Sequence, residues 1–339
     1  MSFRAIWQQF FPSGSTPFTE AELAPGSQVG KVFTITGANS GIGKELTRFL
    51  YPTGATIYLA GRSQERISKA ISEIESTAST SGTKGILKSL HGLDFNDLRT
   101  VKPAYESFAL QEKALHIIWN NAGMVFTPGT STLQGLEGHM GANAVGPFLF
   151  TTLLVPFLKA GAKNSGQPSR IIWTGSVQIE LASPLGGIDF AHLNDGKTIS
   201  KVTDYAASKC GNLFLAHEAA ARWGDQGIIS ICHNPGNLHT SIFDREHWLS
   251  VFILRSFFLY PAKYGAYTMM FSGFSDKITQ AQNGCYVWPF GIIKPCARED
   301  VYKAIDKGKA KQFWEWCEEK LLRVMGTSYS RNQERLGFN

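Results

Sequence analysis

After its first long apolar run, the chain reads Thr36-Gly37-Ala38-Asn39-Ser40-Gly41-Ile42-Gly43. The apolar run predicts a strand at Val29–Thr36, and the residues after the turn predict a helix at Gly43–Leu50. In this arrangement Gly37 permits a tight turn, Gly41 lets the backbone approach a pyrophosphate, and Gly43 lets helix and strand pack closely. The N–H groups and positive dipole of the helix N-terminus would hold the phosphates. The strand–turn–helix context therefore favours a dinucleotide site over a purely structural turn.

Short apolar runs alternate with helical stretches over most of the remaining chain. Further strands are predicted at Ala55–Ala60, Ile86–Leu90, Leu115–Trp119, Arg170–Thr174 and Ile228–Cys232. Helices are predicted at Glu65–Glu75, Pro103–Gln111, Leu133–Lys159 and Tyr205–Trp223. Pro147 and Pro156 should disturb the third of these helices. Strands that are apolar on both faces and alternate with helices indicate a parallel sheet covered on both sides. We therefore expect an α/β fold with one doubly wound domain, to which the later chain adds a strand at Cys285–Trp288 and a helix at Phe313–Val324.

The composition excludes several classes of protein. Of the 339 residues, 43% are hydrophobic and 18% are charged, which is too apolar a mixture for a disordered chain. The formal net charge is +6, but the basic residues form no clustered stripe, so we expect no nucleic-acid partner. Five cysteines without a CxxC pair predict neither a disulfide framework nor a metal site.

Nothing in the sequence has the pattern of a signal peptide or a membrane-spanning helix. The most apolar late run, Trp248–Pro261, is short and contains Arg255, so we expect a cytoplasmic protein without a transmembrane segment. Residues 1–28 form an N-terminal extension in which Phe3, Ile6 and Trp7 have helical spacing. This pattern predicts a short helix docked on the domain, and weak peripheral membrane association is the alternative.

Four further motifs follow the glycine-rich turn in order. They are Asp94 after the third strand, Asn120-Asn121-Ala122-Gly123 after the fourth, Tyr205-Ala206-Ala207-Ser208-Lys209, and Pro235-Gly236 followed by Thr240. With the glycine-rich turn, this series resembles the short-chain dehydrogenase/reductase family over roughly residues 29–240. The resemblance implies one Rossmann-type NAD(P)-binding domain at residues 29–339, in which a substrate lid and C-terminal helices occupy residues 241–339.

The resemblance also implies a nicotinamide cofactor. The residues expected to bind it are Thr36, Gly37, Asn39, Ser40, Gly41, Ile42, Gly43, Arg62, Ser63, Asp94, Asn121, Ala122, Gly123, Tyr205, Lys209, Pro235, Gly236, Leu238 and Thr240. NAD sites usually place an acidic residue at the end of the second strand, but this strand ends Ala60-Gly61-Arg62-Ser63. Arg62 offers a planar donor fork to a 2′-phosphate and Ser63 a hydroxyl, so we predict NADPH/NADP+. A solvated Arg62 at the start of the next helix is the alternative.

Tyr205 and Lys209 are four residues apart, so a helix places both side chains on one face. A phenol has an ordinary pKa of about 10, and a neighbouring ammonium moves it toward the working range of an acid–base group. The resemblance implies that Lys209 also holds the ribose hydroxyls, that Ser176 orients the substrate carbonyl, and that Asn143 supports a water linking Lys209 to solvent. We therefore predict hydride transfer between the nicotinamide and a carbonyl carbon, with Tyr205 exchanging the proton.

The resemblance further implies a bulky lipophilic carbonyl or alcohol as substrate. Ser176 and Tyr205 are 29 residues apart, and the insertion between them resembles that of retinol-dehydrogenase-like members. The Asn234–Thr240 run resembles fungal members, many of which serve secondary-metabolite pathways. Aromatic residues beyond it, such as Phe243 and Trp248, suit a lid over an apolar ligand. A helix packed on the domain or on a second subunit explains these aromatic residues as well.

Several alternatives stay open at this point. The chain would also suit a family member that isomerises or epimerises its substrate with a recycled cofactor, or a retinoid- or steroid-type dehydrogenase. A non-catalytic NADPH-sensing module is disfavoured because Asn143, Ser176, Tyr205 and Lys209 are all present. The family resemblance suggests a homodimer or homotetramer, whereas the long C-terminal portion would cover the usual interfaces.

Overall fold

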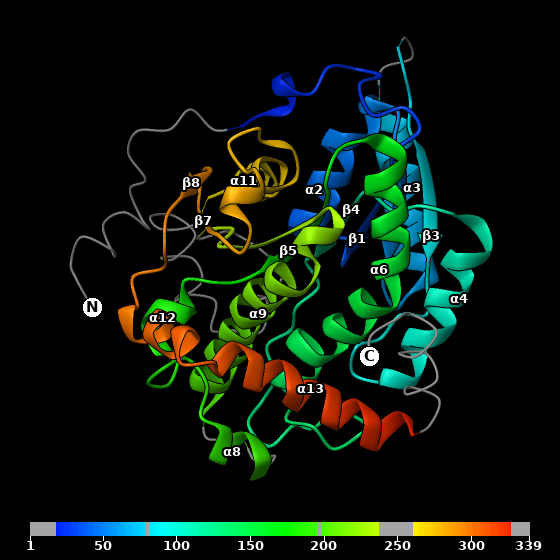
Figure 1. Cartoon of the computed structure of the whole chain (residues 1–339). Helices are drawn as coiled ribbons and strands as arrows, with labels where there is room; N and C mark the ends of the chain where they lie inside the picture. The colour runs from blue at the N-terminus through cyan, green and yellow to red at the C-terminus, as the bar shows by residue number, and fades with distance from the viewer. Residues whose placement is uncertain (1–17, 79–81, 196–197, 199, 237–259, 327–339) are drawn as a thin grey trace.

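The computed structural model describes residues 18–78, 82–195, 198, 200–236 and 260–326 (Figure 1). Its strands are β1 (Val32–Thr36), β2 (Thr56–Ala60), β3 (Ile86–Leu90), β4 (Ile117–Asn120), β5 (Ser169–Thr174), β6 (Ile228–His233), β7 (Tyr286–Trp288) and β8 (Ile292–Ile293). Within these residues they form one sheet in the order β3-β2-β1-β4-β5-β6-β7-β8, and only the β7–β8 pair is antiparallel. The strand order reverses between β1 and β4, and ligands of open α/β sheets bind beyond the carboxyl ends of the strands at such a point. The predicted α/β doubly wound fold is confirmed.

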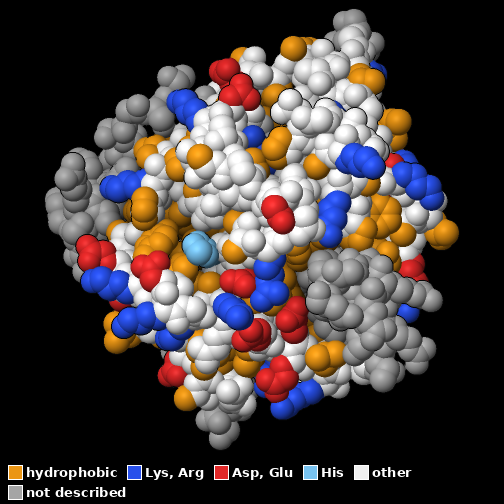
Figure 2. Space-filling model, in the orientation of Figure 1, with side chains coloured by type: hydrophobic (Ala, Val, Ile, Leu, Met, Phe, Trp, Pro, Cys, Tyr) orange, Lys and Arg blue, Asp and Glu red, His pale blue; other side chains and the backbone are white. Residues whose placement is uncertain are grey.

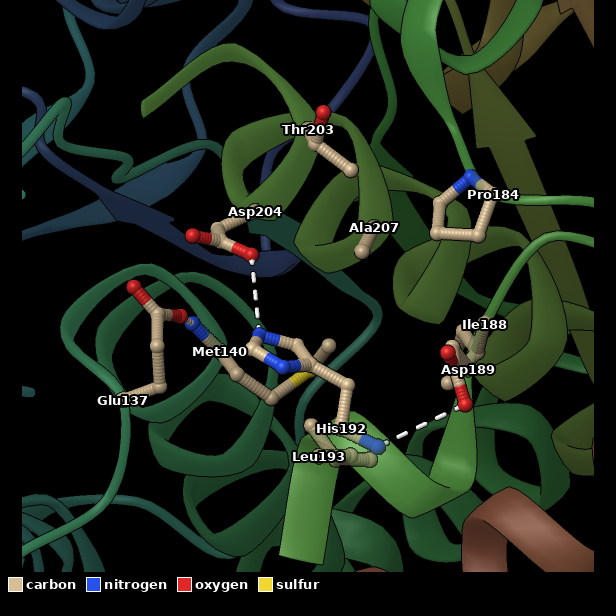
Figure 3. A pocket seen from close by; sticks show the side chains of 10 residues that line it. All are labelled: Glu137, Met140, Pro184, Ile188, Asp189, His192, Leu193, Thr203, Asp204 and Ala207. Atoms are coloured by element: carbon tan, nitrogen blue, oxygen red, sulfur yellow. Dashed lines mark hydrogen bonds and ion pairs between the residues drawn. The ribbon is translucent and has the colours of Figure 1, made fainter. Parts of the chain in front are cut away.

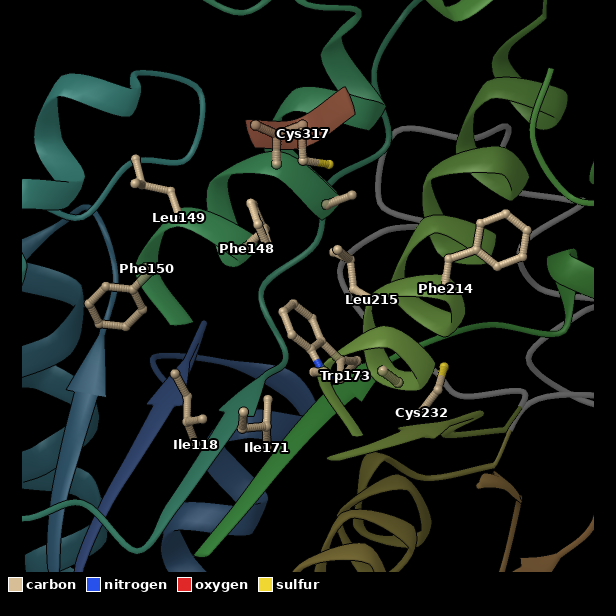
Figure 4. Close-up of a cluster of buried hydrophobic side chains, with 14 of the residues drawn as sticks. Ile118, Phe148, Leu149, Phe150, Ile171, Trp173, Phe214, Leu215, Cys232 and Cys317 are labelled. Atoms are coloured by element: carbon tan, nitrogen blue, oxygen red, sulfur yellow. The ribbon is translucent and has the colours of Figure 1, made fainter. Parts of the chain in front are cut away.

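Helices cover both faces of the sheet (Figure 1). One face carries α2 (Gly41–Leu50), α3 (Gln64–Thr77) and α11 (Ala262–Phe274), and the other carries α4 (Val101–Gln111), α6 (Gly146–Ser165) and α9 (Lys201–Trp223). Figure 4 shows the core on the α6–α9 face, where Trp173 of β5 and Phe148 of α6 are fully buried. An outer helix, α13 (Lys309–Met325), extends this core, because the Trp314 ring lies 4.6 Å from Phe148 and 5.1 Å from Trp223 of α9.

One helical segment of the described residues, Gly138–Ser165, is long and apolar enough to cross a membrane. However, 89% of its most apolar window is buried inside the structure. The apolar surface of this segment is therefore used in the core between the sheet and α13.

The predicted helix at Leu133–Lys159 is wrong in its first part. Gly135 has a left-handed φ of 76°, so a helix begins only with α5 (Gly138–Met140). A π-helical turn, Gly141–Val145, follows and leads into α6, which continues past Pro156. Pro147 lies in the first turn of α6, where its missing N–H is tolerated.

Other boundaries and elements also differ from expectation. β1 begins at Val32 and not at Val29, because the preceding residues form a turn with a left-handed φ of 79° at Gly30. β3 is an edge strand with Ile86 57% exposed, so this strand is not buried on both faces. The sequence patterns missed α7 (Gln178–Ala182), α8 (Phe190–Asp195), α11 and α12 (Glu299–Asp306).

Part of the predicted N-terminal extension is described. Phe18 and Leu23 pack against the core on the α2–α11 face, where the Phe18 ring is 6.3 Å from Phe271. Residues 1–17 lie outside the described part of the chain, as do residues 237–259, which include Leu238, Thr240, Phe243 and Trp248.

Candidate active site

The glycine-rich turn lies at the carboxyl end of β1 and leads directly into α2. A Cβ on Gly43 would lie 2.7 Å from the Gly37 carbonyl oxygen and 2.8 Å from Asn121 Nδ2, so only glycine fits this approach. Gly41 begins α2 with a φ of 54°, which is left-handed and also suits glycine. The N-cap residue Ser40 makes no side-chain cap hydrogen bond. The close packing and the uncapped helix N-terminus fit the pyrophosphate of a dinucleotide.

Thr36 and Asn121 tie the ends of β1 and β4 together at the same point. The Thr36 hydroxyl accepts the N–H groups of Asn121 and Ala122 at 3.0 and 2.9 Å. The Asn121 Nδ2 atom donates to the Thr36 carbonyl oxygen at 2.8 Å. These side chains therefore shape the floor of the site through bonds within the protein.

A large pocket extends across the carboxyl edge of the sheet from this turn. Its lining includes most of the residues expected to bind the cofactor, namely Thr36, Gly37, Asn39, Ser40, Gly41, Ile42, Arg62, Ser63, Asp94, Asn121, Ala122 and Gly123. It also includes residues that the sequence patterns missed, among them Arg66, Asn96, Met124 and Val125. Arg66 lies in the first turn of α3, whereas Arg62 precedes the N-cap Ser63, so helical spacing alone does not relate the two. Gly43, Tyr205, Lys209, Pro235 and Gly236 are described but are not among the lining residues.

One end of this pocket carries two guanidinium groups. The Arg62 side chain is 53% exposed, and its Nη1 atom lies 3.9 Å from Asp94 Oδ2. The Ser63 hydroxyl accepts the N–H of Arg66 at 3.2 Å and caps α3, so this hydroxyl already has a structural partner. On the face shown in Figure 2, acidic and basic side chains are interspersed.

The other end of the pocket adjoins Tyr205 and Lys209 of α9. A Cβ on Gly123 would lie 3.1 Å from Lys209 Nζ, which places the ammonium directly beside the pocket wall. The same Nζ atom lies 5.7 Å from the centre of the Tyr205 ring and donates to the Thr174 carbonyl oxygen at 3.1 Å. Ser176 follows β5 and hydrogen-bonds to the Tyr205 hydroxyl. The sequence-predicted Ser176, Tyr205 and Lys209 are thus brought together.

Burial sets the protonation states of this group. It raises the pKa of Tyr205 to about 12, and the hydrogen bond from Ser176 acts in the opposite direction. It lowers the pKa of Lys209 from the ordinary 10.5 to about 8. The expected lowering of the Tyr205 pKa by Lys209 is therefore not found. At neutral pH Tyr205 is a phenol with a proton to give, beside a lysine that still carries its charge.

Asn143 lies in the π-helical turn and completes the predicted set. Its Oδ1 atom accepts the N–H of Met124 at 2.7 Å, and its Nδ2 atom donates to the Met124 carbonyl at 2.9 Å and to Ser208 Oγ at 3.2 Å. The side chain is therefore fully engaged in holding the loop after β4 to α9.

A second, smaller pocket lies beside α9 (Figure 3). Asp204 and Ala207 line it together with His192 of α8, whose Nε2 atom lies 3.4 Å from Asp204 Oδ1. Since Ala207 is two residues after Tyr205 on a helix, this pocket is separated from the Tyr205 side of α9. Glu137 also lines it.

The comparisons with known proteins agree with this geometry. A family model described as short chain dehydrogenase matches residues 31–188. A short-chain dehydrogenase/reductase of Pestalotiopsis fici, iacJ, is 54% identical over 94% of this chain and 97% of its own length. Retinol dehydrogenase 11 of Homo sapiens is 34% identical over 74% of each chain. Among solved structures, an NADPH-bound carbonyl reductase from chicken fatty liver has the same fold, with a TM-score of 0.56, 20% identity and coverage of 79% of this chain and 99% of that chain.

Proposed function

The chain belongs to the short-chain dehydrogenase/reductase family, and we propose that it is an NADPH-dependent oxidoreductase acting on a bulky lipophilic carbonyl or alcohol. Members of this family are oxidoreductases that use nicotinamide cofactors on small-molecule substrates. The observation that carries the proposal is the position of Lys209, with Tyr205 and Ser176 beside it, against Gly123 in the wall of a pocket. Arg62 and Arg66 line the same pocket.

The residues present fit a nicotinamide dinucleotide. The glycine-rich turn provides room and N–H groups for a pyrophosphate, and Gly123 brings the pocket wall against Lys209. When bound, the cofactor supplies or accepts the hydride. Tyr205 then gives its proton to the substrate oxygen, or takes it back in the reverse direction, while Ser176 orients that oxygen. The Lys209 ammonium stabilises the tyrosinate that results.

The preference for NADPH rests on the end of β2. No acidic side chain follows this strand directly, and Arg62 and Arg66 both line the pocket there. Two guanidinium groups favour a 2′-phosphate, which an acidic residue would repel. The nearest carboxylate described in this pocket, Asp94, pairs with Arg62.

The lipophilic substrate is supported by Met124 and Val125, which give the inner end of the pocket an apolar wall. Retinol, named in the human relative, is itself a lipophilic alcohol. A role in secondary metabolism rests on the resemblance to fungal members and is part of the proposal.

Two measurements test the proposed function. Fluorescence titration of the wild type should show tighter binding of NADPH than of NADH, and the double variant Arg62→Ala/Arg66→Ala should lose about tenfold or more in NADPH affinity with little change for NADH. Tyr205→Phe should keep NADPH binding and lose NADPH oxidation in a screen of lipophilic aldehydes and ketones. Tighter binding of NADH by the wild type would contradict the cofactor assignment. Turnover retained by Tyr205→Phe, or a product formed without net NADPH consumption, would contradict the reaction.

A further inference from the structure

Two side chains of one helical segment hold the loop that follows β4. Asn143 Oδ1 accepts the N–H of Met124 at 2.7 Å, and His139 Nε2 accepts the N–H of Phe126 at 2.9 Å. His139 and Asn143 are four residues apart and share a helix face, while Met124 and Phe126 are two apart and present N–H groups in the same direction. Val125, between them, lines the large pocket. His139 and Asn143 therefore hold this part of the pocket wall through hydrogen bonds to its backbone.

The bond from Phe126 determines which nitrogen of His139 carries the proton. Because Nε2 accepts a hydrogen bond, the proton of the neutral ring is on Nδ1, which lies 2.7 Å from Glu137 Oε1. The other carboxylate oxygen, Glu137 Oε2, accepts the N–H of Met140 at 2.8 Å. His139 is 0% exposed and Glu137 is 7% exposed. Burial raises the pKa of Glu137, but the hydrogen bonds from His139 and Met140 together bring it below its ordinary value, so this group is a carboxylate.

A carboxylate is the group that this arrangement requires. Glu137 accepts from two donors at once, the His139 ring and the Met140 N–H. A glutamine offers one accepting oxygen and one donating NH2 group, so it either leaves the Met140 N–H unpaired or moves the His139 proton to Nε2. In the second case Nε2–H would face the N–H of Phe126, and the bond that holds the loop would be lost.

The His139 ring also links the loop to α9. It packs nearly perpendicular to Phe126, with ring centres 5.4 Å apart, and nearly perpendicular to Tyr205, with ring centres 6.0 Å apart. Lys209 Nζ lies 5.7 Å from the same Tyr205 ring centre. The imidazole therefore fills the space between the pocket wall and the tyrosine that exchanges the proton.

We propose that Glu137 and His139 form a positioning pair that holds the nicotinamide end of the pocket and braces Tyr205. Neither side chain is needed to touch the reacting atoms. The effect of the pair is transmitted through the Met124–Phe126 backbone and the Tyr205 ring. The inference rests on the proposed function for the identity of the cofactor.

Binding of two probes separates this role from general damage to the fold. NADPH contains the nicotinamide, whereas 2′,5′-ADP has the same phosphorylated adenosine half without it. His139→Phe removes the acceptor for Phe126 and should weaken NADPH binding about tenfold, as expected for a lost hydrogen bond at the site, with 2′,5′-ADP binding unchanged within about twofold. Glu137→Gln should act in the same direction. His139→Gln, whose amide oxygen can accept the Phe126 N–H, should regain part of the NADPH affinity.

His116 provides a matched control. Its Nδ1 atom accepts the N–H of Val32 at 3.0 Å, the same kind of bond, but at the amino-terminal edge of the sheet before β1 and β4. Burial lowers the pKa of His116, so this ring is also neutral. His116→Phe should leave the affinities for both probes unchanged.

Each outcome decides between the two proposals. If the wild type binds neither NADPH nor 2′,5′-ADP, the cofactor assignment fails, and the same variants are then compared with NADH and AMP. If the wild type binds but His139→Phe keeps full affinity for the nicotinamide cofactor, the positioning role is overturned. An equal loss of both probes by a folded variant would overturn it as well. Should His139→Phe fail to fold, the same comparison of the two probes with Glu137→Gln and His139→Gln supports or overturns the role.

Discussion

Replacing Lys209 with methionine should abolish turnover and stabilise the fold. The side chain is 2% exposed, and burial lowers the pKa of its ammonium from the ordinary 10.5 to about 8. At neutral pH the buried charge therefore lowers the free energy of unfolding by about 3 kcal/mol. The hydrogen bond to the Thr174 carbonyl offsets about 1 kcal/mol of it. That carbonyl also accepts from Asn212 Nδ2 at 2.9 Å, so it keeps a partner in the variant. We therefore expect Lys209→Met to raise the free energy of unfolding by about 2 kcal/mol.

The extra free energy of unfolding of Lys209→Met should decrease as the pH rises. The folded-state pKa of Lys209 lies below the unfolded value, so between pH 8 and 10.5 the unfolded wild type holds more protons than the folded one. Wild-type stability therefore rises by up to about 3 kcal/mol through this window relative to the variant, so the advantage of about 2 kcal/mol for Lys209→Met reaches zero before pH 10.5. Below about pH 10 Tyr205 keeps its proton in the folded and the unfolded state, so its raised pKa does not affect the comparison there.

Urea denaturation below pH 8 and near pH 10 measures both effects. Lys102 is a suitable control, since its side chain is 42% exposed and its ion pair with Glu106 is a loose contact of 3.7 Å. Lys102→Met should change the free energy of unfolding by less than about 0.5 kcal/mol at either pH. The reasoning is refuted if Lys209→Met is less stable than the wild type at neutral pH, or if its advantage stays the same as the pH rises.

Two further substitutions test the turn and the C-terminal part of the fold. Gly43→Ala places a Cβ 2.7 Å from the Gly37 carbonyl oxygen and should lower the free energy of unfolding by about 1–3 kcal/mol and weaken NADPH binding at least about tenfold in calorimetric titration. A Cβ added at Gly61 would lie 3.7 Å from its nearest neighbours, which is ordinary contact. If Gly61→Ala lost as much stability as Gly43→Ala, the steric argument would be contradicted. Arg298 donates to the carbonyl groups of Ile179 in the first turn of α7 and of Ser183 and Pro184 just beyond it, and Arg298→Met should cost about 2–4 kcal/mol in urea denaturation. Arg298 also lowers the pKa of Asp300, so the stability it adds is present above the ordinary value of 3.8 and is lost as the pH falls below it; a destabilisation that persists unchanged in acid would speak against this ion pair.

Much of the fold was predictable because its signals are local. The limits of β3 agree with the predicted Ile86–Leu90, and the glycine-rich turn lies between a strand and a helix as its spacing indicates. α11 was missed for a physical reason. Residues Gly265–Gly273 of this helix are buried all round, so its sequence carries no alternation between an apolar and a polar face. The helical segment begins at Gly138 and not at Leu133 because Gly135 has a left-handed φ, which a glycine permits but does not require.

By itself, the sequence determined the class of fold, the dinucleotide turn and the pairing of Tyr205 with Lys209, because each depends on spacing within one strand, turn or helix. The tertiary structure alone decided which distant groups meet. It placed the Glu137–His139 pair between Phe126 and Tyr205, which lies 66 residues after His139 in the chain. It also buried Lys209 deeply enough to lower its pKa. Burial and long-range hydrogen bonds arise only when the sheet brings these segments together, so no local pattern reports them.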